Sequence, residues 1–77
     1  MKSTFTKEYA AFLAGLVEAR KEKGLTQQAV ATLLDKPQSF VSKYESGERR
    51  LDVVEFCHIA KVLGHNPIDL LHRCGLV

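Results

Sequence analysis

Four polar side chains lie close together between residues 38 and 43, and each can form hydrogen bonds. They are Gln38, Ser39, Ser42 and Lys43. A helix that buries the neighbouring Phe40, Val41 and Tyr44 exposes these four side chains. The Gln38 amide suits adenine N6 and N7, and Lys43 can donate to guanine O6 and N7. The two serines can approach bases or phosphates, so the exposed face is suited to contact with nucleic acid.

Catalysis and metal binding require other groupings of side chains, which the sequence does not provide. Cysteine and histidine occur near each other only at residues 57–58 and 72–74, whereas a structural zinc site needs four ligands at recognisable spacing. We expect Cys57 in the core, Cys74 in the tail and the three histidines at the surface. No Ser, His and Asp grouping supports nucleophilic catalysis, and no glycine-rich phosphate loop follows a strand. We therefore expect no enzyme activity, metal, cofactor or small-molecule ligand.

Two short helices with a tight break between them must position the polar face. Thr26 can cap the first helix with its hydroxyl group. The apolar stripe of this helix consists of Val30, Ala31, Leu33 and Leu34. Asp35 interrupts the stripe, and Pro37 disfavours the helical conformation at the residue before it. The second helix is therefore expected to begin at Gln38 and to end at Gly47, where a positive φ is easily adopted.

Three further helices complete an all-α chain. The first, capped by Thr6 or Ser3, carries an apolar stripe of Phe5, Tyr9, Phe12, Leu13, Leu16 and Val17. Asp52 caps a fourth helix, whose predicted buried side is Val53, Phe56, Cys57, Ile59, Ala60 and Leu63. Asn66 and Pro67 begin a fifth. The expected helices cover about 6–23, 26–34, 38–46, 52–63 and 67–73, in one domain over residues 1–77.

The segment 27–46 resembles the helix-turn-helix of the Cro and phage-repressor type, also called the XRE family. The small Ala31 stands at its fifth position, and the family's buried positions hold Val30, Leu34, Val41 and Tyr44. The later pattern S-x-x-E-x-G-x-R-x-L is also typical of the family, and the likeness extends from about residue 18 to residue 71. Asp35 replaces the usual turn glycine, but aspartate tolerates the left-handed conformation.

The resemblance implies a compact, lambda-repressor-like bundle of five helices that binds double-stranded DNA. The helix over 38–46 would lie in the major groove, and the helix over 27–34 would cross the backbone. Gln27 matches a family position that holds a phosphate, with Gln28 beside it. Arg49 and Arg50 follow the groove helix, where they can either contact phosphates or belong to a solvated loop. By the same match, Arg20 forms a structural ion pair with Glu45.

The chain ends in a tail that is more apolar than a free terminus requires. This tail either folds back on the core or covers a partner, and in the family the last helix commonly forms the dimer contact. We therefore predict a homodimer. Its predicted contact residues are Ile68, Leu71, Cys74, Leu76 and Val77.

Length and composition limit the possible functions. A chain of 77 residues leaves no room for a separate sensor domain, and its net charge of +2 permits a nucleic-acid partner without requiring one. Two distant cysteines, no signal peptide and no long apolar run predict a cytoplasmic protein that does not enter a membrane.

The function predicted from the sequence is a transcriptional regulator that binds DNA sequence-specifically, with repression of a near-palindromic operator as the leading form. One alternative is a regulator that acts with a protein partner, such as an antitoxin or the controller of a restriction-modification operon. Another is a protein-interaction module on the same fold. Such a module is expected to carry aromatic or aliphatic anchors on the exposed face of the helix over 38–46, where the sequence has polar residues instead.

Overall fold

Five α-helices make up the computed structural model, which describes residues 6–77. They are α1 (Lys7–Glu22), α2 (Gln27–Leu34), α3 (Gln38–Ser46), α4 (Val53–Val62) and α5 (Pro67–Arg73). The described residues contain no β-strand, so the all-α prediction is confirmed. Each helix begins and ends within one residue of its expected bounds. The predicted cap at Ser3 and the apolar Phe5 lie outside the described residues.

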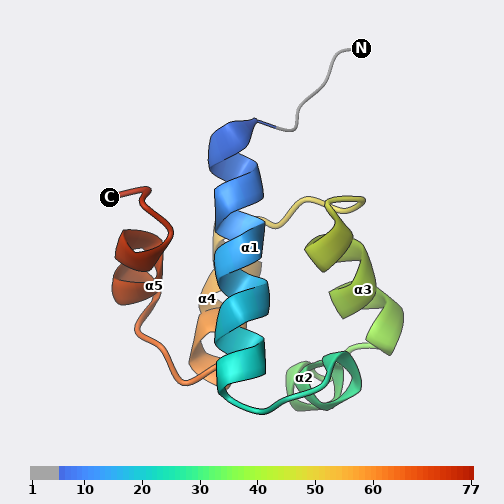
Figure 1. The fold of residues 1–77 in the computed structure, drawn as a ribbon. Helices are drawn as coiled ribbons and strands as arrows, with labels where there is room; N and C mark the ends of the chain where they lie inside the picture. The colour runs from blue at the N-terminus through green and yellow to red at the C-terminus, as the bar shows by residue number, and fades with distance from the viewer. Residues whose placement is uncertain (1–5) are drawn as a thin grey trace.

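Helix α1 stands in the middle of the fold (Figure 1). The α2–α3 pair lies on one side of it and α5 on the other, while α4 lies behind it in this view. Helix α1 contacts both α3 and α5, and α4 contacts both α2 and α5. The polar face predicted on α3 and the apolar C-terminal segment are therefore held on opposite sides of the molecule.

Short side-chain caps determine where most of the helices begin. The hydroxyls of Thr6 and Thr26 each accept a backbone N–H three residues later, both at 3.0 Å. At the start of α4, the Asp52 carboxylate accepts the backbone N–H of Glu55 at 2.7 Å, and the Glu55 carboxylate accepts that of Asp52 at 3.1 Å. This capping box satisfies two amide groups that a helix start leaves without partners.

The turn between α2 and α3 depends on Asp35. Its φ of 59° and ψ of 45° place it in the left-handed region, and no other non-glycine residue among those described has a positive φ. In this conformation the backbone N–H of Lys36 reaches the Ala31 carbonyl at 2.9 Å and closes the end of α2. Asp35 therefore adopts the left-handed conformation at the place of the usual turn glycine, and Pro37 directly precedes the first residue of α3.

The core contains buried side chains from all five helices. Its members are Phe12, Leu13, Leu16, Ala19, Val30, Ala31, Val41, Tyr44, Phe56, Ile59, Ala60, Leu63 and Leu70. Two residues that were predicted to be buried are not. Leu33 is 61% exposed because its side chain points about a quarter-turn away from the stripe of α2 that faces the core. Val53, the first residue of α4, is 76% exposed.

Candidate nucleic-acid interface

The outer face of α3 is polar, and its inner face is fixed in the core. Val41 and Tyr44 are 0% and 1% exposed, and the Tyr44 ring meets the Phe40 ring edge-on with centroids 5.5 Å apart. Burial raises the pKa of the Tyr44 hydroxyl well above its ordinary value, so this side chain stays neutral. Of the predicted base-contacting residues, Gln38, Ser39 and Lys43 are exposed, whereas Ser42 is half-buried.

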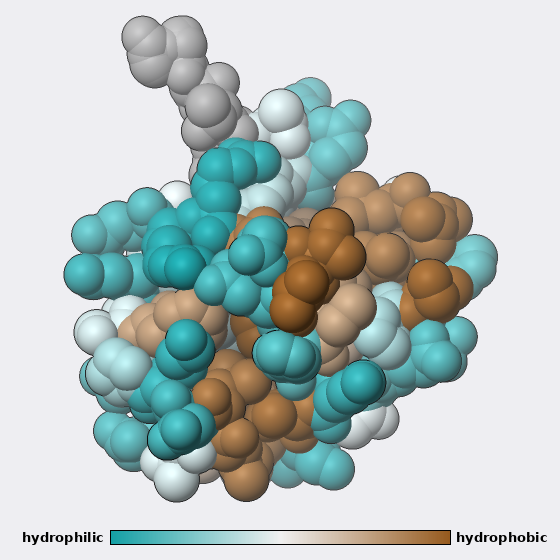
Figure 2. Space-filling view, turned by 180° about the vertical axis from the view of Figure 1, so that it is seen from behind, coloured by the Kyte–Doolittle hydropathy of each residue, from teal (hydrophilic) through white to brown (hydrophobic). Residues whose placement is uncertain are grey.

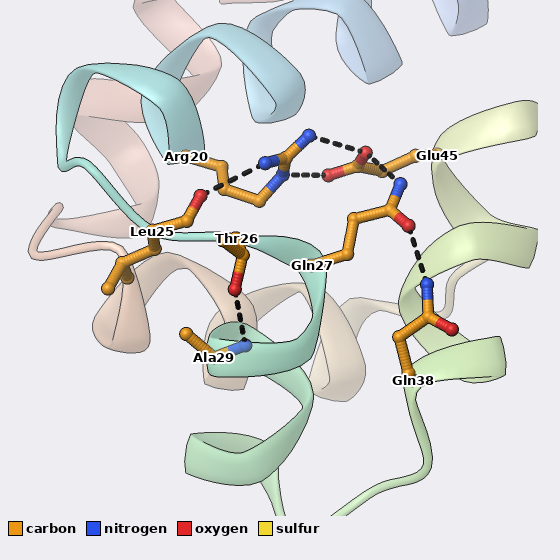
Figure 3. Close-up of polar contacts among 7 residues, drawn as sticks. All are labelled: Arg20, Leu25, Thr26, Gln27, Ala29, Gln38 and Glu45. Atoms are coloured by element: carbon orange, nitrogen blue, oxygen red, sulfur yellow. Dashed lines mark hydrogen bonds and ion pairs between the residues drawn. The ribbon is translucent and has the colours of Figure 1, made fainter.

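The Arg20 guanidinium joins the end of α1 to α3 through a two-pronged ion pair with Glu45 (Figure 3). Arg20 Nε lies 2.7 Å from Glu45 Oε2, and Arg20 Nη2 lies 3.1 Å from Oε1. Arg20 Nη1 also donates to the Leu25 carbonyl at 3.0 Å. The side chains are 12% and 7% exposed, and the hydrogen bond to Glu45 raises the pKa of Arg20. The pair therefore fixes the position of α3 relative to α1 and to the loop before α2.

Gln27 extends this network from the Arg20–Glu45 pair to the surface. Its Nε2 donates to Glu45 Oε1 at 2.8 Å, and its Oε1 accepts a hydrogen bond from Gln38 Nε2, also at 2.8 Å (Figure 3). Gln38 is thus exposed but already oriented by a neighbour. The sequence alone does not connect Gln27 with Gln38 or Glu45, because no short spacing joins residues that lie 11 and 18 positions apart. Gln28, on the outer surface of α2, donates to Thr32 Oγ1 at 3.2 Å.

The two arginines of the loop after α3 are both held in place. Arg49 Nη2 and Nη1 donate to Glu55 Oε2 and Oε1 at 2.7 and 3.0 Å, and the guanidinium carbon lies 5.0 Å from the Phe40 ring centroid. Arg50 covers the Tyr9 ring, with its guanidinium carbon 4.1 Å from the centroid. The Arg49 hydrogen bonds lower the pKa of Glu55, and those same bonds raise the pKa of Arg49. The loop therefore presents both cations beside the end of α3 in a defined arrangement.

On the opposite side of the molecule, the predicted dimer residues divide into two groups. Ile68, Leu76 and Val77 are 59%, 38% and 63% exposed. Leu71 packs partly on the core, and Cys74 turns toward its own chain, where its thiol lies 3.8 Å from the Phe12 carbonyl. Burial raises the pKa of the Cys74 thiol.

Cys74 also explains why Gly15 of α1 has no side chain. A Cβ atom there would come within 2.4 Å of the Cys74 sulfur. Arg73 donates to Glu18 at 3.0 Å and also to Glu22, so α5 is held against α1 by polar as well as apolar contacts. The end of the chain is therefore partly folded back on the core, as one of the two alternatives predicted.

An apolar groove lies between α1, the start of α4 and α5. Its volume is about 440 Å³, and its lining includes Phe12, Val53, Phe56, Ile68 and Leu76. Seen from behind, hydrophobic surface extends from the middle of the molecule toward the side where α5 lies (Figure 2). This surface differs in chemical character from the polar face of α3.

Residues 6–77 contain neither a metal-ion cluster nor a membrane-spanning helix. No group of three or more histidine, cysteine, aspartate or glutamate side chains there could hold a metal ion. No helix in that range is long and apolar enough to span a membrane.

The bundle, with α2 packed against α3 and a polar outer face on α3, defines a helix-turn-helix DNA-binding domain. A family model described as helix-turn-helix matches residues 16–71. A solved structure, an XRE-family like protein from Pseudomonas syringae pv. tomato str. DC3000, is 47% identical with a TM-score of 0.84. The match covers 88% of this chain and 83% of that one. No curated protein matches.

The chain belongs to the XRE family of helix-turn-helix proteins. It is a DNA-binding regulator of that family, and its helix-turn-helix implies double-stranded DNA as the partner. The family assignment made from residues 27–46 and the S-x-x-E-x-G-x-R-x-L pattern is thus confirmed.

Proposed function

We propose that this protein is a sequence-specific repressor that binds a near-palindromic operator as a homodimer. The observation that carries the proposal is the state of Gln38, which is exposed on α3 and held in one orientation by Gln27. A side chain that is ordered before binding loses less conformational entropy when it meets a base.

Recognition of bases is assigned to the face of α3. With α3 in the major groove, Gln38 pairs with adenine through N6 and N7, and Lys43 donates to guanine O6 and N7. Ser39 and Ser42 supply shorter contacts to bases or phosphates, with the half-buried Ser42 nearer the protein surface.

Contact with phosphates is assigned to the residues around this face. Gln27 and Gln28 lie in the first turn of α2, where backbone amides and the helix dipole also favour an anion. Arg49 and Arg50 carry positive charge beside the end of α3. These contacts fix the register of the domain on the duplex without determining its sequence preference.

The dimer contact is assigned to the apolar surface on the far side of the molecule. Ile68, Leu76 and Val77 are its exposed members from the predicted set, and Val53 of α4, 76% exposed, lines the same groove as Ile68 and Leu76. An exposed surface of this kind is typical of an association site, and a second copy provides the same surface in return. Leu71 and Cys74 support the surface from beneath.

Selection of bound duplexes from a random pool tests the DNA-binding part of the proposal. We expect two related half-sites whose centres lie about 34 Å apart, one helical turn of the duplex, because each third helix enters one major groove. A set of recovered sequences with no common motif contradicts specific recognition. A single half-site without its inverted copy contradicts the symmetric dimer.

Sedimentation equilibrium tests the dimer contact separately. Ile68→Asp introduces a charge into the proposed contact and should shift the protein toward monomer. Leu33→Asp is the matched control, because Leu33 on α2 is 61% exposed and Ile68 is 59% exposed. Removal of residues 74–77 should also weaken association. If Ile68→Asp and the truncated chain associate as the parent does, this surface is not the dimer contact.

The apolar groove supports one alternative, a regulator that acts with a protein partner, such as an antitoxin or a restriction-modification controller. In that case the partner covers the surface that a second copy would otherwise occupy. A parent protein that stays monomeric at high concentration and binds single half-sites favours this alternative. The polar face of α3 argues against a module that binds only protein, because hot spots in protein interfaces are rich in aromatic residues.

A further inference from the structure

A continuous chain of hydrogen bonds runs from the end of α1 to the first residue of α3 (Figure 3). Arg20 donates to Glu45, Gln27 donates to Glu45 at 2.8 Å, and Gln38 donates to Gln27 at 2.8 Å. The Glu45 side chain is 7% exposed, whereas Gln38 stands at the surface. A nearly buried carboxylate is thus connected to a side chain on the proposed recognition face.

The direction of every bond in this chain follows from the chemistry of Glu45. An ionised carboxylate only accepts hydrogen bonds, so Gln27 must turn its NH₂ group toward Glu45. The amide oxygen of Gln27 then faces Gln38, which must turn its own NH₂ group inward. The Gln38 oxygen and one remaining N–H are left for the DNA. The oxygen and nitrogen of an amide are hard to distinguish by shape, but here the carboxylate fixes both amides.

We propose that Glu45 is a specificity-determining positioning residue, which acts through Gln27 to fix the orientation of the Gln38 amide against the DNA. The proposal rests on the function proposed above, in which Gln38 contacts a base. Adenine offers an N6 donor to the outward oxygen and an N7 acceptor to the remaining N–H. Guanine places its O6 acceptor opposite that oxygen. Glu45 therefore favours adenine over guanine without touching DNA.

Substitutions at three positions separate this role from a structural one. Glu45→Gln keeps the size of the side chain but adds an NH₂ group, which opposes the donors of Arg20 in either orientation. Neither direction of the hydrogen bonds from residue 45 through Gln27 to Gln38 is then strongly preferred. Gln27→Leu removes the link between the carboxylate and Gln38. Arg20→Ala is the matched control, because it breaks the same ion pair as Glu45→Gln. It leaves the Glu45 carboxylate in place, which accepts hydrogen bonds and cannot donate them.

The measurement is the ratio of affinities for two duplexes. One is the operator recovered from the random pool, and the other has guanine in place of the adenine at the base pair where Gln38→Ala loses preference. A ratio for one protein sample does not depend on the fraction that is folded, so a loss of stability does not affect it. We expect roughly a tenfold ratio or more for the parent, in the range of a good bidentate contact. Glu45→Gln and Gln27→Leu should reduce it to within about threefold, whereas Arg20→Ala should keep it.

Three results would overturn the proposal. In the first, Glu45→Gln and Gln27→Leu both keep the ratio of the parent. In the second, Arg20→Ala loses the ratio as fully as Glu45→Gln, which assigns the effect to disturbed packing of α3. In the third, Gln38→Ala changes the preference at no base pair, although the parent still selects a defined operator. Failure of the proposed function differs from all three, because the parent then selects no operator.

Discussion

Two arginine–glutamate pairs are both bidentate but have very different surroundings. In each pair a guanidinium donates to both carboxylate oxygens, with a shortest distance of 2.7 Å. The Arg20 and Glu45 side chains are 12% and 7% exposed, whereas those of Arg49 and Glu55 are 43% and 22% exposed. Burial therefore distinguishes an arginine that can only hold the fold together from one that can exchange its carboxylate for a phosphate.

The largest expected effect comes from breaking the buried pair. Arg20→Ala leaves the Glu45 charge nearly buried with only Gln27 to bond it, which should lower the free energy of unfolding by about 3 kcal/mol. In a domain of this size the melting temperature should fall by on the order of 10 to 20 °C. Arg49→Ala is the control and should melt close to the parent. Equal melting temperatures for the two variants would show that burial does not separate the pairs.

The exposed pair should influence DNA binding instead. Arg49→Ala should weaken the binding of all duplexes by similar factors and reduce the slope of log affinity against log salt by about one unit per subunit. Glu55→Gln should instead strengthen the binding of all duplexes, because it releases Arg49 and removes a negative charge beside the proposed phosphate contact. Affinities for operator and random duplexes at several salt concentrations test both. Weaker binding by Glu55→Gln would mean that Glu55 positions Arg49 rather than competing with DNA for it.

The smallest effect is the dependence of stability on pH. Hydrogen bonds from Arg49 and from the backbone of Asp52 lower the pKa of Glu55. The stability that this gives is present above the ordinary glutamate pKa of about 4.3 and is lost as pH falls through the lowered value. The parent should therefore melt above Glu55→Gln at neutral pH, and the difference should disappear in acid. A difference that stays constant down to pH 2 would contradict this account.

The prediction from sequence agrees best with the structure where interactions between residues close in the chain determine the start of a helix. Thr26 and Asp52 each accept a backbone N–H three residues later, and Pro37 restricts the backbone of the residue before it, so the starts of these helices could be predicted from the sequence. Leu33 and Val53 were misplaced because apolar periodicity does not show how far a neighbouring helix covers a stripe.

The polar network could be predicted only in part. The resemblance to the XRE family suggested that Arg20 meets Glu45, and the structure brings these residues together. The bonds of Gln27 to Glu45 and to Gln38 depend on how closely α2 and α3 pack, which no local pattern records. Arg49 and Arg50 could be placed after the groove helix from the sequence, but their contacts with the rings of Phe40 in α3 and Tyr9 in α1 could not.

The claim that α3 recognises bases while the arginines beside it contact phosphates is tested most directly with Gln38→Ala and Arg50→Ala. The measurement is the affinity of each variant for the selected operator and for all its single-base variants, at several salt concentrations. We predict that Gln38→Ala costs roughly 1 to 3 kcal/mol on the operator and removes the preference at one base pair. Arg50→Ala should weaken every duplex equally and lower the salt slope by about one unit per subunit. If instead Arg50→Ala changed base preference and Gln38→Ala weakened all duplexes alike, α3 would not lie in the major groove as proposed.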